Sequence, residues 1–331
     1  MGGRTDRVVD VVTGISDLRA FVLPMRQRFR GTTRRAGLLL RGAAGWGEFS
    51  PFPEYGPEYA ARWLAAAREA ALEPFPTAVR DRVPVNTTVP ATDPATAHRL
   101  VVTSGCTTAK VKVAETGQDL ADDVERVAAV RDALGPAGRI RVDANAAWDV
   151  ETAVLAVARL DRAAGGLEYV EQPCPTLEEL REVRGRVGVP LAADESVRTA
   201  EDPLRIADLD AADAIVVKVQ PLGGVRRALE VVDAAGLPAV VSSAVESSVG
   251  LGAGLALAAA LPDLPFACGL GTATLLAADV TAEPLVPHEG HLEVRRVTPD
   301  AALLDQCAPD PDVTAELLER ASLAAAHLEG S

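Results

Sequence analysis

Lysine is rare in this chain, and its positions suggest proton chemistry. Of the 33 Lys and Arg residues, only Lys110, Lys112 and Lys218 are lysines, and all three lie in short apolar, β-branched runs. Arginine stays protonated in proteins, whereas a buried lysine beside another lysine and a divalent cation has a lowered pKa. Lysines on exposed sites would instead fall mostly on helix surfaces. We therefore predict that these residues act as acids or bases.

Polar residues recur at the ends of the apolar runs, at intervals of one strand–helix unit. Each predicted strand is followed by the next after 31, 28, 23, 24 and 24 residues, counted through Lys112, Asp143, Glu171, Asp194, Lys218 and Ser242. Buried barrel strands should be apolar, so charged residues at their ends are exceptional. We expect the six side chains to form a ring at the C-terminal mouth of a barrel, where barrel active sites lie.

Three carboxylates of this ring, Asp143, Glu171 and Asp194, come from successive predicted strands. Carboxylates packed together cannot all stay ionised without a cation. Ligands that are all oxygen suit Mg²⁺ or Mn²⁺. The alternative, that single members cap helices or pair with arginine, is weaker for three in a row at this spacing.

The two neighbouring lysines lie on one side of the predicted site. Lys110 and Lys112 are two residues apart on a strand and so point to the same face. Lys218 lies three strands beyond the first carboxylate, which places it across the mouth from Lys112.

Short strands that alternate with helices must position these residues. The predicted strands are Val83–Thr88, Thr108–Val113, Arg139–Asp143, Leu167–Glu171, Pro190–Asp194, Ala214–Val219, Pro238–Ser243 and Pro265–Cys268. The predicted helices are Leu120–Leu134, Val150–Ala163, Leu177–Val187, Val225–Ala235 and Ser247–Ala260. Eight strands in alternation with helices indicate an α/β barrel of the (β/α)8 type.

The flanks do not continue this rhythm. Strand-like runs at Val8–Val12 and Ala36–Arg41 precede a helical stretch at Glu58–Leu72, and a terminal helix is predicted at Val313–His327. We expect an α+β capping domain formed from both chain ends, with residues 1–82 as its first part, 83–275 as the barrel and 276–331 returning to the cap. Loops at Pro24–Arg35 and Ser50–Gly56 are expected to cover the barrel mouth.

Composition narrows the class of protein. The 331 residues are 48% hydrophobic with a formal charge of −14, so a large core is possible and nucleic acid or anionic membrane partners are disfavoured. The longest apolar run, Val249–Leu261, is shorter than the ~20 residues that span a bilayer. Four scattered cysteines fit a reducing compartment, so we expect a cytoplasmic protein. No obligate protein partner is evident in the sequence.

The strand-end residues resemble those of a known family. The order Lys-x-Lys, Asp-x-Asn, Glu-Gln-Pro, Asp-Glu-Ser and Lys-x-Gln is similar to that of the enolase superfamily, muconate-lactonizing-enzyme subgroup. The resemblance implies a (β/α)7β TIM-like barrel, with Asp143, Glu171 and Asp194 as Mg²⁺ ligands. It also implies that Lys112 removes a proton α to a carboxylate, that Lys110 tunes it, and that Lys218 is the opposite lysine.

Three further segments resemble the o-succinylbenzoate synthase family of that subgroup: Gly45–Pro51, Ser242–Leu251 and Gly269–Thr272. This resemblance implies dehydration of 2-succinyl-6-hydroxy-2,4-cyclohexadiene-1-carboxylate to o-succinylbenzoate in menaquinone biosynthesis. The expected partner is a small carboxylate substrate. Its expected contacts are Ser242, Ser243, Gly269 and Arg30, with Asn145 and Glu195 behind the site.

Other activities fit the same residues. An N-acylamino acid racemase, an epimerase or a cycloisomerase of the superfamily would use the same ring. Cys268–Ala273 contains no acid that could hold an ammonium group, which argues against a dipeptide substrate. A Schiff-base aldolase would also use a strand lysine, and a metal-stabilised structural barrel would give the lysines no purpose.

Overall fold

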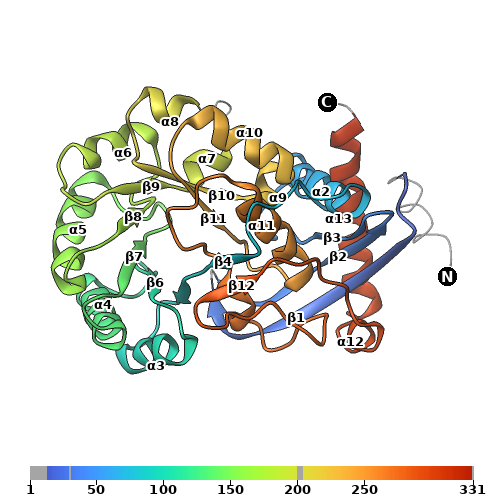
Figure 1. Cartoon of the computed structure of the whole chain (residues 1–331), viewed down its shortest axis with the longest axis horizontal. Coiled ribbons are helices and arrows are strands. Elements are labelled where there is room, and N and C mark those ends of the chain that lie inside the picture. Colours follow the sequence, from blue (N-terminus) through green and yellow to red (C-terminus); the bar gives the residue numbers. More distant parts are fainter. Residues whose placement is uncertain (1–12, 30, 200–203, 330–331) are drawn as a thin grey trace.

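A curled parallel sheet forms the centre of the molecule (Figure 1). The computed structural model describes residues 13–29, 31–199 and 204–329. The sheet order is β11-β10-β9-β8-β7-β6-β5. Its strands are β5 (Thr87–Val89), β6 (Thr108–Lys112), β7 (Arg139–Asp143), β8 (Tyr169–Glu171), β9 (Leu191–Ala193), β10 (Ala214–Lys218) and β11 (Ala239–Ser242). Neighbouring strands run parallel, so all their carboxyl ends meet at one mouth.

The two edges of this sheet are joined by a short segment in place of a full eighth strand. The predicted strand Pro265–Cys268 is reduced to isolated parallel bridges, one between Ser242 and Gly269 and one between Val85 and Cys268. The amide of Gly269 donates to Val241 O at 2.8 Å. Because Pro265 has no amide hydrogen, it cannot extend the ladder.

The predicted first strand, Val83–Thr88, is wrong as a single element. Its first part is β4 (Arg82–Pro84), which pairs antiparallel with β12 (His291–Glu293) outside the barrel sheet. Its second part contributes to β5. Beyond Pro84 the chain passes to the barrel: the Val85 amide donates to Gly290 O at 2.8 Å, and the Asn86 amide donates to Cys268 O at 3.0 Å.

Helices cover the outside of the sheet, and most begin at a side-chain cap (Figure 1). They are α3 (Pro94–Ser104), α4 (Leu120–Leu134), α5 (Val150–Ala164), α6 (Leu177–Arg184), α7 (Glu195–Thr199), α8 (Leu204–Asp208), α9 (Val219–Leu222), α10 (Val225–Ala235) and α11 (Ser248–Ala260). Asp119 caps α4 through a reciprocal bond with Asp122, and Thr176 does the same for α6 with Glu179. Almost all of α11 is buried, as its continuous apolar sequence predicts.

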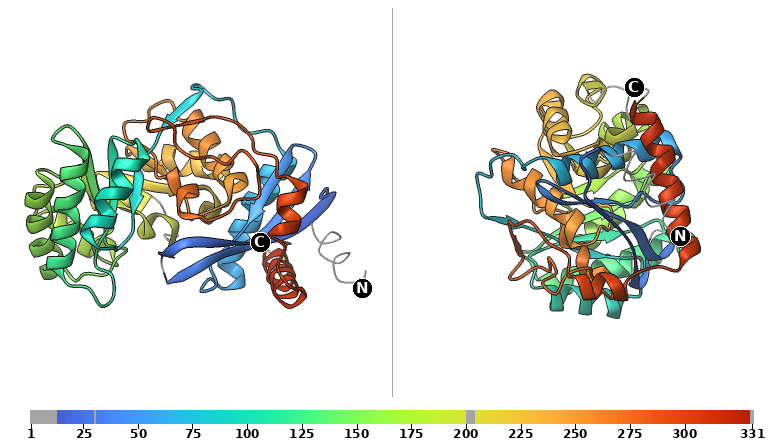
Figure 2. Two further views of the ribbon diagram at one scale, coloured as in Figure 1. Left: turned by 90° about the horizontal axis from the view of Figure 1, so that it is seen from below. Right: turned by 90° about the vertical axis from the view of Figure 1, so that its right-hand side faces the viewer.

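The capping domain is assembled from both chain ends, as predicted (Figure 2). Its antiparallel sheet contains β1 (Asp17–Phe29), β2 (Thr32–Gly42) and β3 (Gly45–Phe49), and its main helices are α2 (Pro57–Leu72) and α13 (Pro311–Glu329). Phe49 and Trp63 share one core with Leu317 and Ala321 of α13. The fold class is therefore confirmed. The divisions at 82/83 and 275/276 stay a prediction.

The cap sheet differs from the sequence prediction at its hairpin. The expected loop Pro24–Arg35 is wrong, because β1 continues to Phe29 and β2 begins at Thr32. The register shifts between Pro24 and Phe29, so an irregular strand replaces the loop. The predicted strand Val8–Val12 lies outside the described residues.

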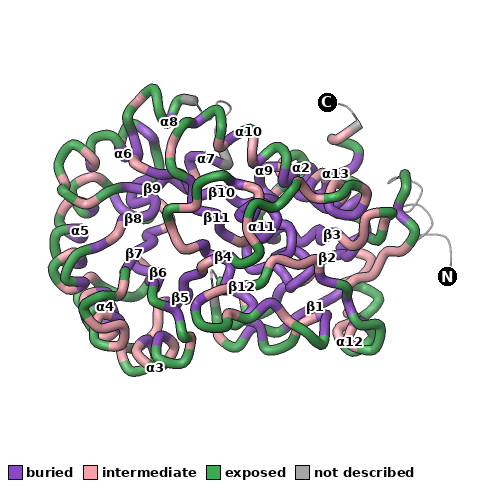
Figure 3. The backbone as a smooth tube through the Cα atoms, in the orientation of Figure 1, coloured by how far each residue is buried: buried purple, intermediate pink, exposed green. Residues whose placement is uncertain are grey.

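Burial follows the layers of the fold. The strands of the barrel are largely buried, whereas β1 and β2 of the cap sheet mix buried with more exposed residues and the outer helices are exposed on one side (Figure 3). Within the described residues, no helix combines the length and the apolar character that a membrane span needs. Cys106, Cys174, Cys268 and Cys307 are all free thiols.

Candidate active site

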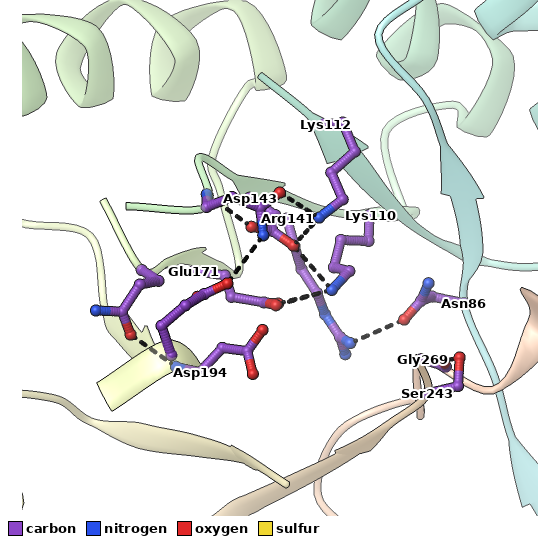
Figure 4. Close-up of polar contacts among 12 residues, drawn as sticks. Asn86, Lys110, Lys112, Arg141, Asp143, Glu171, Asp194, Ser243 and Gly269 are labelled. Carbon is purple, nitrogen blue, oxygen red and sulfur yellow. Dashed lines mark hydrogen bonds and ion pairs between the residues drawn. The ribbon is translucent and has the colours of Figure 1, made fainter. Parts of the chain in front are cut away.

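The predicted ring is gathered at the carboxyl ends of the barrel strands (Figure 4). Lys112 pairs in register with Asp143, and Asp143 with Glu171, so adjacent strand ends place these side chains together. Asp194 directly follows β9, and Lys218 is the last residue of β10. All the lysines and carboxylates of the ring are buried.

Each lysine contacts a carboxylate of the ring. Lys110 Nζ lies 3.1 Å from Asp143 Oδ2 and 2.8 Å from Glu171 Oε1. Lys112 Nζ lies 2.5 Å from Asp143 Oδ2, and Lys218 Nζ lies 2.5 Å from Asp194 Oδ2. Three positive charges therefore face three negative charges, which makes the burial of six ionisable groups tolerable.

The two lysines of β6 have opposite electrostatic surroundings. Burial lowers the pKa of Lys112, Asp143 raises it, and the nearby Lys110 charge lowers it, with a net decrease. Burial also lowers the pKa of Lys110, but Glu171 and Asp143 raise it well above its usual value. Of the pair, Lys112 therefore has the lower pKa and loses its proton more readily than Lys110.

The carboxylates differ in the same way. Burial raises the pKa of Asp143, but Lys112 and Lys110 hold it well below its usual range. Burial and the charge of Asp143 raise the pKa of Glu171 to about 7. The ionised form of Glu171 is therefore disfavoured, and a cation beside it would stabilise that form.

The donor set suits a hard cation, although its members are drawn to the lysines. Among the described residues, no three acidic, histidine or cysteine side chains are gathered closely enough to hold a metal as they stand. The ammonium of Lys110 contacts both oxygens of Glu171 and one of Asp143, so a cation already lies between these two carboxylates. Three buried carboxylates on adjacent strands fit Mg²⁺ once the lysines release them.

Two neighbouring cavities lie at this mouth, and Lys112 and Asn145 line both. The inner pocket is lined by Phe52, Thr88, Lys110, Lys112, Asn145, Lys218, Ser242, Ser243, Ala244, Val245, Gly269 and Thr272. The outer cavity has a volume of about 730 Å³ and is lined by Arg28, Gly31, Pro90, Ala91, Lys112, Val113, Glu115, Thr116 and Asn145. Lys112 thus faces both cavities.

The other predicted site residues are placed as follows. Ser242, Ser243 and Gly269 line the inner pocket, and Ser243 Oγ donates to Gly269 O at 3.0 Å. Asn145 Oδ1 accepts from Lys112 Nζ at 2.7 Å, and its amide donates to Glu195 at 3.3 Å. Arg30 lies outside the described residues.

Two buried residues near the site were not predicted as part of it. Gln172 Oε1 accepts from the amides of Asp194 and Ser196, which ties the end of β8 to the end of β9. Arg141 lies below Asp143 and donates to Asn86 Oδ1 at 3.3 Å (Figure 4). It also donates to Ala267 O at 2.6 Å. Arg141 carried a sequence signal, since it is a charged residue two positions from Asp143 on one strand face.

Comparisons with known proteins place the chain in a family. Residues 93–300 match the family model described as "Enolase C-terminal domain-like", and residues 20–71 match "Enolase N-terminal domain-like". An o-succinylbenzoate synthase of Thermobifida fusca is 64% identical over 293 residues, which cover 88% of this chain and 92% of that protein. The chain belongs to the o-succinylbenzoate synthase family of the enolase superfamily. Members of this family are carbon–oxygen lyases, and this chain is one of these enzymes.

Other family members and solved structures agree with this placement. The o-succinylbenzoate synthase of Mycolicibacterium smegmatis is 55% identical and covers 89% of this chain and 91% of that protein. The muconate lactonizing enzyme of Pseudomonas fluorescens, solved with muconolactone, has a TM-score of 0.75 at 22% identity, with 90% and 100% of the two chains covered. The L-Ala-D/L-Glu epimerase of Bacillus subtilis has a TM-score of 0.73 at 22% identity, with 87% and 98% covered. These two structures support the fold alone.

Proposed function

We propose that this enzyme dehydrates 2-succinyl-6-hydroxy-2,4-cyclohexadiene-1-carboxylate to o-succinylbenzoate in menaquinone biosynthesis. The observation that carries this assignment is that Lys112 and Lys218 line one pocket from different strands, beside the carboxylates of the ring. The name of the Thermobifida fusca relative supports the choice of substrate.

Lys112 supplies the proton chemistry. In its neutral form it takes the proton α to the substrate carboxylate, which leaves negative charge on that carboxylate. The same lysine, now protonated, assists the departure of hydroxide on the same face, so that one proton and one hydroxide leave as water. Lys110 stays charged and keeps the pKa of Lys112 low. Lys218 stays charged and stabilises the intermediate by charge or by contact with the forming ring.

Asp143, Glu171 and Asp194 would hold a Mg²⁺ or Mn²⁺ ion, whose charge would stabilise the negative charge that develops on the substrate carboxylate. To do so, these carboxylates must exchange their lysine contacts for the ion. Gln172 would keep the ends of β8 and β9 together during this exchange, because its side chain bonds to Cys174 O, to Ser196 Oγ and to the amide of Asp194.

The second carboxylate of the substrate needs a cation outside the inner pocket. Arg28, on the irregular part of β1, lines the outer cavity together with Lys112. We assign Arg28 to the succinyl carboxylate, with Ser242, Ser243 and Gly269 forming the wall of the inner pocket. The substrate then extends from the lysines toward the cap.

Racemisation of an N-acylamino acid is the second candidate, because Lys112 and Lys218 share one pocket and could exchange protons on opposite faces. Incubation in D₂O with both classes of substrate separates the two activities. We expect loss of water from the cyclohexadiene carboxylate, followed by NMR. Exchange of the α-proton for deuterium without loss of water would refute the dehydratase and favour the racemase.

The cysteines and the net charge bear on the cellular location and the partners of the enzyme. The four free cysteines support a reducing, cytoplasmic location. The formal charge of −14 supports a small-molecule carboxylate as the partner, since long polyanions would be repelled.

A further inference from the structure

A buried carboxylate of the capping domain reaches into the barrel. Glu48 lies on β3 and is only 3% exposed. Its Oε2 accepts hydrogen bonds from Ser247 Oγ at 2.5 Å and from Gly250 N at 3.1 Å. Ser247 is the N-cap residue of α11, and Gly250 lies in the first turn of that helix. Glu48 therefore binds the amide groups with which a barrel helix begins.

A second cap residue holds the preceding turn. Arg35, on β2, is buried and donates from Nε to Val245 O at 3.1 Å and from Nη2 to Ser50 O at 2.5 Å. Its guanidinium carbon lies 4.1 Å from the centre of the Phe52 ring. Ser50 Oγ in turn donates to Glu48 Oε1 at 2.6 Å. Arg35 thus binds the first residue of the segment from Val245 to Gly250, and Glu48 binds its last residue.

This segment forms part of the pocket wall. Ala244 and Val245 line the inner pocket beside Lys218, and Phe52 lines it from the cap. Val245 has a φ of +61°, a conformation that β-branched residues rarely adopt. Such a residue persists only where its surroundings hold it, and the bonds from Arg35 and Glu48 supply that support.

We propose that Glu48 is a positioning residue for the reaction: its bonds to Ser247 and Gly250 fix the turn that forms the pocket wall beside Lys218. Nothing in Glu48 touches the reacting atoms, so it acts through the position of Ala244 and Val245. The catalytic part of this role rests on the proposed function, whereas the effect on the turn does not.

Gly250 offers a second way to disturb the same contact. A Cβ at Gly250 would lie 2.8 Å from Glu48 Oε2, 2.9 Å from Gln220 Nε2 and 2.6 Å from Glu246 Cβ. The carboxylate would have to move. Gly252, two residues along the same helix, is a matched control, because a Cβ there would meet its nearest neighbour, Arg295 O, at 3.7 Å. Both substitutions exchange glycine for alanine in one helix, and only one pushes on Glu48.

The test compares the full-length wild type with Glu48→Gln, Gly250→Ala and Gly252→Ala. Hydrogen exchange of the peptide that contains residues 244–250 is measured together with kcat and KM for the cyclohexadiene carboxylate. In Glu48→Gln and Gly250→Ala we expect faster exchange in this peptide, unchanged exchange in β6–β8, and a fall in kcat/KM of about 10- to 100-fold. Gly252→Ala should match the wild type.

The outcomes are distinguishable. Wild-type exchange and kinetics in both Glu48→Gln and Gly250→Ala would overturn the role of Glu48, and so would a uniform rise of exchange across the barrel, which marks a general loss of stability. If Glu48→Gln does not fold, Glu48→Asp is measured in its place, because it keeps the carboxylate but draws it back from Ser247 and Gly250. If the wild type has no dehydratase activity, the proposed function fails, and the exchange of residues 244–250 still tests the effect on the turn.

Discussion

Lys112→Arg separates the role of a base from the role of a cation. Lys112 Nζ contacts Asp143 Oδ2 at 2.5 Å and Asn145 Oδ1 at 2.7 Å. Arginine preserves the positive charge toward these acceptors but does not deprotonate in proteins. A positioned general base contributes about 10²- to 10⁴-fold to the rate, so we expect kcat to fall by that factor. This corresponds to roughly 3–5 kcal/mol of activation free energy.

The matched control is Lys110→Arg, two residues away on the same strand face. The neighbouring Glu171 and Asp143 outweigh burial and hold the pKa of Lys110 well above its usual value, so its role requires only charge. We expect Lys110→Arg to retain at least about tenfold more activity than Lys112→Arg, because the lost base costs about 10²-fold or more. Initial rates of o-succinylbenzoate formation, with melting temperatures to check folding, provide the assay. A folded Lys112→Arg enzyme with near wild-type kcat would refute the reasoning, as would equal losses in the two variants.

Three further predictions concern the metal, the cap and the outer cavity. Burial and the charge of Asp143 raise the pKa of Glu171 from 4.5 to about 7. In the metal-free protein, the contribution of this group to the free energy of unfolding is therefore fully present below pH 4.5. It falls by roughly 3 kcal/mol as the pH rises through 7. Mg²⁺ should therefore raise the melting temperature more at pH 8 than at pH 5.5, and an equal gain would contradict this. Gly47→Ala should lower the free energy of unfolding by about 3 kcal/mol in a denaturant titration, because its Cβ would lie 2.0 Å from Ala67 O. Gly188→Ala is the control: open space surrounds its Cβ, so the free energy of unfolding should stay close to that of the wild type. Arg28→Gln should raise KM about 10-fold with little change in kcat, and an unchanged KM would remove Arg28 from the substrate site.

The ring could be predicted from the sequence because its residues break a strong rule. A buried parallel strand should be apolar, and Lys112, Asp143 and Glu171 end such strands. Their spacing follows the length of one strand and one helix, which local periodicity reveals. The same local signals gave the bounds of α4, β7 and α10 as the structure has them.

Long-range pairing could not be read in this way. The pairing of β4 with β12 joins segments about 200 residues apart, and the local sequence of Arg82–Pro84 does not indicate which strand it pairs with. The pairing of β1 with β2 converts a Pro/Arg-rich stretch into an irregular strand, because cross-strand contacts outweigh weak local preferences. The contact of Glu48 with α11 depends on how the cap docks on the barrel, which only the folded chain reveals.

Conversion of the purified enzyme's substrate is the most direct test of the central claim. The cyclohexadiene carboxylate is incubated with the wild type and Mg²⁺, with the chelated enzyme, and with the chelated enzyme after Mg²⁺ is restored. We predict that o-succinylbenzoate forms with Mg²⁺, that its formation stops on chelation, and that it returns when the ion is restored. An unchanged substrate with Mg²⁺, or equal rates in all three samples, would contradict the account.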